Sequence, residues 1–248
     1  MMYVTGDTHS DFSRFKMKNF PEQKEMDKND YVVICGDFGG LWSGSKEENF
    51  WLDWLDGRPF TTLFVSGNHE NYDMLDALPA EDMFGGRVQR VRKSVMHLMR
   101  GQVYEIAGKR IYSMGGASSH DMEDGILDPS APGYMRTKRR LDMQGGHYRV
   151  RGKSWWEREL PCDSEYQNSE KNLDLCKRRV DYIFTHCCPT HISDIIGGGE
   201  YKSDRLTDYF DAISQNCDFR YWFFGHYHDN RVIDQRYVLL YEQIVRIV

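Results

Sequence analysis

Three short apolar runs in the first third of the sequence end in the same way, with a glycine followed by an acid or an amide. They read VTGDTH, VICGDF and FVSGNH, and helix-like segments follow them over 11–20, 46–57 and 71–78. This alternation of strand, loop and helix predicts an α/β fold with an open sheet. Ligands of such sheets bind at the carboxyl ends of the strands, where the polar residues of these runs stand.

The rest of the chain predicts further strands, in a mixed sheet or in two sheets. Residues 102–116 are typical of a hairpin that turns at Gly108-Lys109, and later strands are expected within 180–189, 219–228 and 236–248. We expect helices over 153–160 and 168–179. Residues 120–153, with Gly, Pro and many charges, are expected to be irregular.

The bulk composition favours one cytoplasmic domain. The chain has 248 residues and a net charge of −6, which disfavours a surface-wide affinity for nucleic acid or an anionic membrane. No stretch is typical of a secretory signal or a membrane span. The six cysteines form no CxxC pair, and the adjacent Cys187 and Cys188 are poorly placed to bridge each other, so we expect reduced thiols.

Polar side chains suited to metals stand at five of the predicted strand ends. Within the pairs 7/9 and 226/228, a spacing of two residues places both side chains on one side of an extended strand. The full set comprises Asp7, His9, Asp37, Asn68, His69, His186, His226 and His228.

Taken singly, each of these residues has a plainer interpretation, as a helix cap, a turn former or an ordinary surface histidine. Together they favour a metal site, because all five strand ends carry residues competent to bind metal. Carboxylate, amide and imidazole suit Mn²⁺, Fe²⁺ or Zn²⁺, and the set fits two ions better than one.

The order of these blocks resembles that of the calcineurin-like metallophosphoesterases. Their signature runs D-x-H, G-D, G-N-H-[DE], H and G-H-x-H, and here it spans residues 7 to 228. The resemblance implies a four-layer α/β/β/α sandwich with two mixed β-sheets. Residues 1–248 would form a single domain, with a loop insertion at about 122–148.

The resemblance also implies a role for each matched residue. Asp7, His9 and His228 would hold one divalent metal ion, and Asn68, His186 and His226 the other. Asp37 would bridge both ions, and His69 would face the substrate. We expect Mn²⁺, with Fe, Zn or Ni as alternatives. His186 would be the ligand in THCCPTH, with Cys187, Cys188 and Pro189 shaping the loop behind it and His191 an ordinary loop residue.

Two further comparisons refine the resemblance. The second block reads GDFGG and lacks the arginine of G-D-x-x-D-R-G, which weakens the case for a protein Ser/Thr phosphatase. The segments GGASSHD and RGKSWWERELP resemble those of a bacterial and phage branch, in which they lie closer together. Two acids, Glu70 and Asp11, are either supports that orient imidazoles or ordinary helix-start carboxylates.

The charge of such a site predicts hydrolysis of phosphate mono- or diesters. Two divalent ions and two aspartates leave about +2, which suits in-line attack of a metal-bridging hydroxide on an anionic ester. His69 would act as general acid or electrostatic stabiliser, a role that typically contributes 10²–10⁴-fold.

The basic segment 134–153 is either an anion-gripping flap beside the metals or a solvated loop, and Arg149 is the candidate substrate contact. Trp155 and Trp156 are expected in the core.

The alternatives to an enzyme are a non-catalytic metal-binding scaffold and a nucleic-acid-binding module on the same fold. As partners we expect a phosphate-ester substrate, nucleic acid only as a substrate and no membrane. The sequence leaves the oligomeric state and the physiological substrate open.

Overall fold

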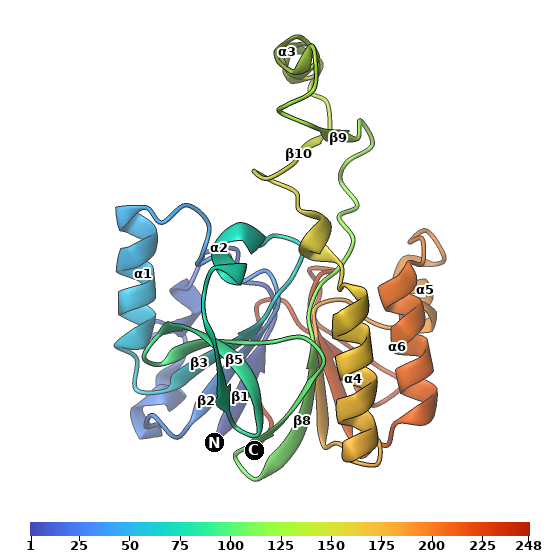
Figure 1. The fold of residues 1–248 in the computed structure, drawn as a ribbon. Helices are drawn as coiled ribbons and strands as arrows, with labels where there is room; N and C mark the ends of the chain where they lie inside the picture. The colour runs from blue at the N-terminus through green and yellow to red at the C-terminus, as the bar shows by residue number, and fades with distance from the viewer.

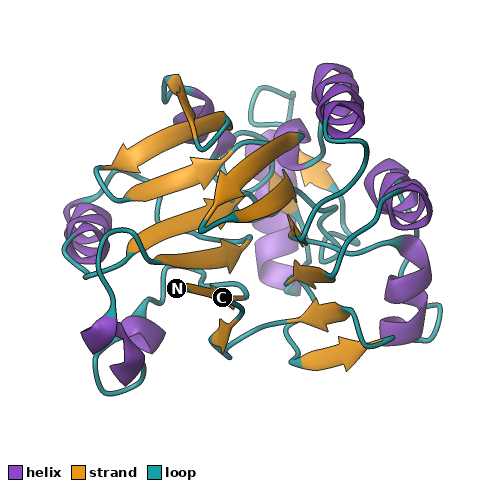
Figure 2. Cartoon of the chain, turned by 90° about the horizontal axis from the view of Figure 1, so that it is seen from below, coloured by secondary structure: helices purple, strands orange, loops and turns teal.

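A computed structural model describes all residues from 1 to 248, and its centre is a pair of sheets packed face to face (Figures 1 and 2). The first sheet has the order β15-β1-β2-β3-β6-β5-β4, in which β1, β2, β3 and β6 run parallel. Its strands are β1 Met2–Thr5, β2 Tyr31–Cys35, β3 Thr61–Val65, β4 Ala80–Met83, β5 Gly86–Arg92, β6 Val95–Leu98 and β15 Val245–Arg246.

The second sheet has the order β13-β14-β12-β11-β8-β7, with parallel pairing from β14 to β8. Its outer strands β13 and β7 are antiparallel, so both sheets are mixed. Its strands are β7 Gln102–Ile106, β8 Lys109–Met114, β11 Tyr182–Thr185, β12 Tyr221–Phe224, β13 Arg231–Ile233 and β14 Tyr237–Leu239.

Helices cover the outer face of each sheet. Helices α1 and α2 pack on the first sheet, and α4, α5 and α6 on the second (Figure 1). Their bounds are α1 Lys46–Asp56, α2 Tyr72–Asp76, α4 Asp163–Leu175, α5 Thr190–Gly197 and α6 Arg205–Asn216. No helix is both long enough and apolar enough to cross a bilayer.

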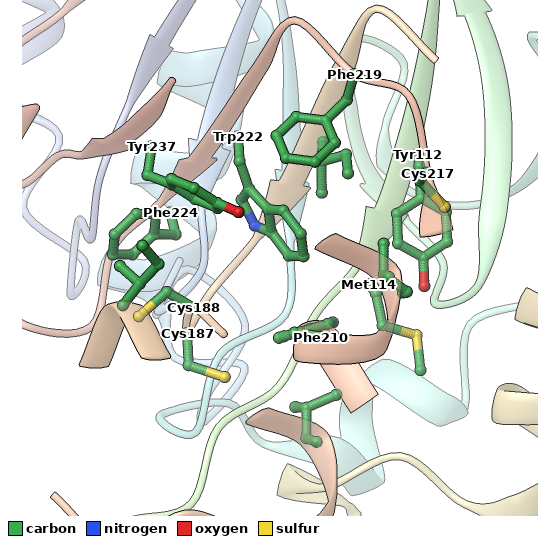
Figure 3. Close-up of a cluster of buried hydrophobic side chains, with 14 of the residues drawn as sticks. Tyr112, Met114, Cys187, Cys188, Phe210, Cys217, Phe219, Trp222, Phe224 and Tyr237 are labelled. Atoms are coloured by element: carbon green, nitrogen blue, oxygen red, sulfur yellow. The ribbon is translucent and has the colours of Figure 1, made fainter. Parts of the chain in front are cut away.

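The hydrophobic residues form three clusters, one for each boundary between layers. Along β2, Val32 and Ile34 face the outer helices, whereas Val33 and Cys35 face the second sheet. This alternation explains why the strands are apolar throughout: both faces are buried. The third cluster joins the second sheet to its helices and includes Trp222 and Phe210 (Figure 3). The expected four-layer α/β/β/α sandwich is confirmed.

Two predicted helices are wrong. Within 11–20 only Ser13–Phe15 forms a 3-10 turn, although Phe12, Phe15 and Phe20 are buried. Their spacing reflects three separate anchors in the core, not one side of a helix. Within 153–160 only Glu157–Glu159 forms a 3-10 turn, because Trp156 extends into the core, as predicted for its side chain, and contacts Trp42.

Other predicted elements agree with the structure more closely. Helix α1 begins after Ser45, whose side chain accepts a hydrogen bond from the Glu48 amide, and ends at Gly57. The hairpin β7–β8 turns at Ala107-Gly108, one residue earlier than predicted. Helix α4 begins at 163, not 168, and ends before the basic residues 177–179.

The segment expected to be irregular forms a projecting arm, which we define as residues 122–153. It contains strands β9 Ile126–Leu127 and β10 Arg149–Val150, which pair in parallel, and helix α3 Tyr134–Gln144. Figure 1 shows α3 at the far end of the arm, away from both sheets. The prediction of irregular structure is therefore wrong for α3, whose sequence lacks the apolar stripe that marks a helix packed on a core.

The buried His97 on β6 should make stability depend on pH. Its Nδ1 lies 2.8 Å from Gln89 Oε1, and burial lowers the pKa of its imidazole to about 3. The unfolded chain therefore binds more protons below about pH 6.5, so stability is lost as pH falls towards 3. Between pH 6.5 and 4, we expect wild type to lose about 3 kcal/mol more unfolding free energy than His97→Gln.

Urea unfolding of both proteins across this pH range measures the difference. The exposed His147 supplies the control, since His147→Gln should follow wild type. Parallel losses in wild type and His97→Gln would contradict the prediction.

Candidate metal centre

The carboxyl ends of parallel strands from both sheets meet at one edge of the molecule. Strands β1, β2 and β3 of the first sheet end there, together with β11 and β12 of the second. Each expected ligand follows one of these strands by one to four residues. They are Asp7, His9, Asp37, Asn68, His186, His226 and His228.

One group of facing atoms comes from Asp7, His9 and His228. The Nε2 atoms of His9 and His228 are 3.1 Å apart, and His228 Nε2 is 3.1 Å from Asp7 Oδ2. The ligand atoms of the three residues all lie within 4.8 Å of one another, a separation compatible with one ion. The carboxylate is buried, whereas the two histidines are partly open to solvent.

A second group surrounds His186. Its Nδ1 lies 2.9 Å from the carbonyl oxygen of Cys35, which fixes the tautomer of a neutral ring with the proton on Nδ1. Its Nε2 then faces Asn68 Oδ1 at 3.0 Å and Asp37 Oδ2 at 3.3 Å. In a neutral ring Nε2 is an acceptor that faces two acceptor oxygens, which is the arrangement of a metal-binding histidine whose other nitrogen donates to the backbone. Without an ion, a proton on Nε2 takes this place.

His226 completes this second group. Its ring centroid is 4.9 Å from that of His186, and its Nε2 is buried without a hydrogen-bond partner. A buried polar atom without a partner calls for an explanation, and a bound cation supplies one.

The electrostatics of the centre favour positive charge between its aspartates. Burial would lower the pKa of His186, but Asp37 and Asp7 raise it to about 9. Burial would raise the pKa of Asp37, yet His186 holds it below the usual value. The donor set, the facing acceptors and the partnerless Nε2 of His226 all fit divalent cations.

Glycine precedes several of these residues because the side chain of another candidate ligand lies close to the glycine Cα. A Cβ on Gly67 would stand 2.1 Å from Asp37 Oδ1, and one on Gly225 would stand 2.0 Å from Asp7 Oδ1. Neither glycine has a positive φ. The glycine of the GN and GH blocks is thus required for close approach between strands rather than for a sharp turn.

Four of the seven expected ligands have a left-handed backbone. The φ angles are 43° at His9, 43° at Asp37, 70° at His226 and 48° at His228. Such conformations cost non-glycine residues about 1–3 kcal/mol each and persist only where the surroundings enforce them. At Asp37 the carboxylate helps to do so, since its Oδ1 accepts a hydrogen bond from the His69 amide at 2.7 Å.

A buried chain of hydrogen bonds orients Asn68. Both carboxylate oxygens of Glu159 accept from Ser119, Oε1 from the amide at 3.0 Å and Oε2 from Oγ at 2.8 Å. Because Ser119 Oγ donates to Glu159, it accepts from Asn68 Nδ2, 3.3 Å away. The amide oxygen of Asn68 is thereby directed at the centre. Ser119 and Glu159 lie in the two segments that resemble the bacterial and phage branch, but sequence analysis predicted no role for either residue.

The two acids left open by the sequence have different roles. Asp11 accepts from the Ser13 amide at 2.8 Å, as a helix-start carboxylate does. Glu70 is buried and accepts from the Phe38 amide at 2.8 Å, next to Asp37. It therefore supports the backbone of a candidate ligand rather than an imidazole, and burial raises its pKa to about 8.

His69 and Arg149 meet at the edge of the centre. Arg149 Nη2 lies 3.3 Å from His69 Nε2, and it forms an ion pair with Asp121 at 2.5 Å. A guanidinium only donates, so His69 Nε2 is the acceptor and carries no proton in this arrangement. Of the basic segment 134–153, the four basic residues between 136 and 140 lie on α3 at the far end of the arm, away from the centre. Arg151 stacks on Trp155, and Arg149 is the basic residue of the segment that hydrogen-bonds to a residue of the centre.

Four residues near the centre have surroundings that the sequence did not predict. Cys187 and Cys188 pack in the core under α5 and α6 (Figure 3). His191 lies on α5, not in a loop, and pairs with Asp211. His120 was not foreseen, although its ring centroid is 4.9 Å from that of His226.

Removing the support of Asn68 should weaken metal binding. On the expectation that Asn68 is a ligand, Ser119→Ala frees its amide to rotate, and we expect Mn²⁺ affinity to fall about 10-fold or more. Titration calorimetry on metal-free protein measures it. Ser118→Ala is the matched control, because Ser118 Oγ bonds to Asp204 instead. Equal affinities of the two variants would contradict the role given to Ser119.

Comparison with known proteins bears on this geometry. No curated protein matches the sequence at a significant level. A family model described as calcineurin-like phosphoesterase matches residues 2–230, a stretch that contains the whole candidate centre. The family hydrolyses phosphate esters with the help of metal ions. By that match, which covers most of its length, the chain belongs to the calcineurin-like phosphoesterase family.

Proposed function

We propose that the protein hydrolyses phosphate mono- or diesters at a dinuclear metal centre. The observation that supports this most is the convergence of metal-binding atoms from five strand ends, with His186 Nε2 facing the side-chain oxygens of Asn68 and Asp37. Asp7, His9 and His228 would hold one ion, and Asn68, His186 and His226 the other. Asp37 would contact both, since its Oδ2 lies 3.7 Å from His9 Nε2 and 3.3 Å from His186 Nε2.

The metals give the site its affinity for anions. Bound divalent ions, for which we propose Mn²⁺ with Fe, Zn or Ni as alternatives, lower the pKa of water and offset phosphoryl charge. Asp7 and Asp37 are the only buried carboxylates among the ligands, so the loaded centre keeps a net positive charge that suits a phosphate ester. The six free cysteines suit a reducing compartment, and we propose a cytoplasmic location.

His69 is placed to act on the leaving group. Its amide is tied to Asp37, which holds the residue beside the centre while its ring remains free of the ligand set. Burial lowers the pKa of its imidazole, and the charge of Arg149 lowers it further. A proton on Nε2 therefore requires that Arg149 leave its present contact. We propose that Arg149 moves to the phosphate when substrate binds, which frees His69 Nε2 to take up a proton from solvent and then to protonate or stabilise the leaving oxygen.

A cavity beside Asp7 and His9 offers room for the rest of a substrate. Its volume is about 560 Å³, and its walls include aromatic and acidic side chains. Tyr241, one of the aromatic walls, stacks on His228 with ring centroids 4.6 Å apart. The acids of the wall are Asp7, Asp11, Glu22 and Glu242, and its one arginine, Arg14, donates to backbone carbonyl oxygens. A leaving group without further negative charge fits such walls better than a second phosphate does.

The hydrolytic proposal is tested with aryl phosphate mono- and diesters. We expect wild type with Mn²⁺ to cleave at least one of them. His69→Ala should lower kcat about 10²–10⁴-fold while Mn²⁺ stoichiometry stays unchanged. Asp37→Asn should lose both activity and stoichiometric binding, because one buried charge between the ions is removed.

The surface variant His191→Ala is the control for loss of a histidine, and it should match wild type. Wild-type protein that cleaves neither ester with Mn²⁺, Fe²⁺, Zn²⁺, Ni²⁺ or Mg²⁺ would overturn the proposed function.

The contact between Arg149 and substrate gives a separate prediction. A charge-assisted hydrogen bond contributes about 1.5–3 kcal/mol, so Arg149→Ala should lower kcat/KM about 10- to 100-fold. Steady-state kinetics on the better aryl ester measure the loss, with the exposed Arg87→Ala as control. Unchanged kcat/KM in Arg149→Ala would show that the residue does not contact the phosphate.

A further inference from the structure

The arm presents a helix face that nothing else in the protein covers. Residues 134–153 carry seven basic side chains and one acid, whereas the whole chain has a net charge of −6. Figure 1 places α3 at the far end of the arm, where it projects into solvent. Four of the seven basic residues, Arg136, Lys138, Arg139 and Arg140, lie on α3. The chain outside residues 134–153 is net acidic.

Three arginines on α3 are free to bind a ligand. Arg136, Arg139 and Arg140 are exposed, and none has an acidic partner within 4.0 Å. Their spacing of three and four residues places them on one side of the helix. Acids of the arm are engaged elsewhere: Asp142 pairs with Lys138 at 2.8 Å, and Asp124 accepts from the His147 amide at 2.9 Å.

The opposite side of α3 is fixed to the arm. Leu141 is buried, and the hydroxyl of Tyr148 donates to Asp142, so the helix is held against the chain that leads into β10. The side chain of Lys138 lies over the Tyr148 ring, 5.7 Å from its centroid. These contacts fix α3 to the arm and leave the side that carries the three arginines exposed.

Two exposed methionines lie among the arginines. Met135 and Met143 are 71% and 80% exposed, and Arg139 stands four residues from each. Apolar and cationic groups thus alternate along the face. A helix that inserts into a membrane surface instead keeps a continuous apolar side, which α3 lacks. A single nucleic acid strand offers both phosphates for the arginines and unstacked bases for guanidinium planes and apolar side chains.

We infer that the outer face of α3 is a binding site for single-stranded nucleic acid, formed by Arg136, Arg139, Arg140, Met135 and Met143. The acidic body confines this binding to the arm, since it repels a polyanion elsewhere. The site is distinct from the metal centre, and binding at α3 does not depend on ester hydrolysis.

The experiment is fluorescence anisotropy with a labelled 20-nucleotide DNA strand, in EDTA so that no hydrolysis occurs. Wild type should bind with strong salt dependence. The triple variant Arg136→Gln/Arg139→Gln/Arg140→Gln should flatten the slope of log affinity against log salt by about 2 and weaken binding on the order of 100-fold at 50 mM salt. A triple change to Lys, which keeps the charge, should retain most of the slope.

The matched control removes three exposed lysines from the body, as Lys18→Gln/Lys24→Gln/Lys46→Gln. It should bind as wild type does. Equal losses in the two Gln triples would overturn the inference, as would binding of poly-glutamate or of phosphatidylserine vesicles as tight as that of DNA. Failure of the aryl ester assay would leave this result intact, so the two proposals fail separately.

Discussion

The structure depends on bringing negatively polarised atoms together at the edge shared by two sheets. His186 Nε2 lies 3.0 Å from Asn68 Oδ1 and 3.3 Å from Asp37 Oδ2, and the Nε2 atoms of His9 and His228 are 3.1 Å apart. Oxygen and ring nitrogen atoms this close repel one another unless a proton or a metal cation lies between them. Because the strands that carry them belong to a packed core, the chain cannot relax by separating the groups. The fold therefore builds a requirement for positive charge into its own interior.

Neighbouring residues help to maintain the arrangement of the candidate ligands. Gly67 and Gly225 have no Cβ, which leaves room for the carboxylates of Asp37 and Asp7. Four of the candidate ligands have a left-handed backbone conformation. The buried carboxyl groups of Glu70 and Glu159 accept hydrogen bonds from backbone and hydroxyl groups. Both carboxyl oxygens of Glu159 accept from Ser119, whereas Asp37 has one oxygen that accepts from the His69 amide and a second that lies beside His186 Nε2.

The sequence predicted the fold class and the location of the candidate ligands, because each ligand follows an apolar run directly and parallel strands end at one edge. It could not predict elements whose form depends on distant contacts. Phe12, Phe15 and Phe20 have helix-like spacing but are separate core anchors, and Trp156 is drawn out of a helical pattern by Trp42. The support of Asn68 by Ser119 and Glu159 joins residues 51 and 40 positions apart, which no local pattern reveals.

Arg149 connects the arm with the candidate metal centre. It lies at the base of the arm, and its guanidinium is shared between the Asp121 carboxylate and His69 Nε2. An exposed carboxylate competes for a guanidinium only weakly, since solvent screens the pair. On the proposed function, the phosphate group of an ester held beside bound metals would compete better, because the metals fix its position. The ion pair with Asp121 thus keeps the Arg149 guanidinium near His69 at the base of the arm. From this position the guanidinium could turn towards a bound phosphate.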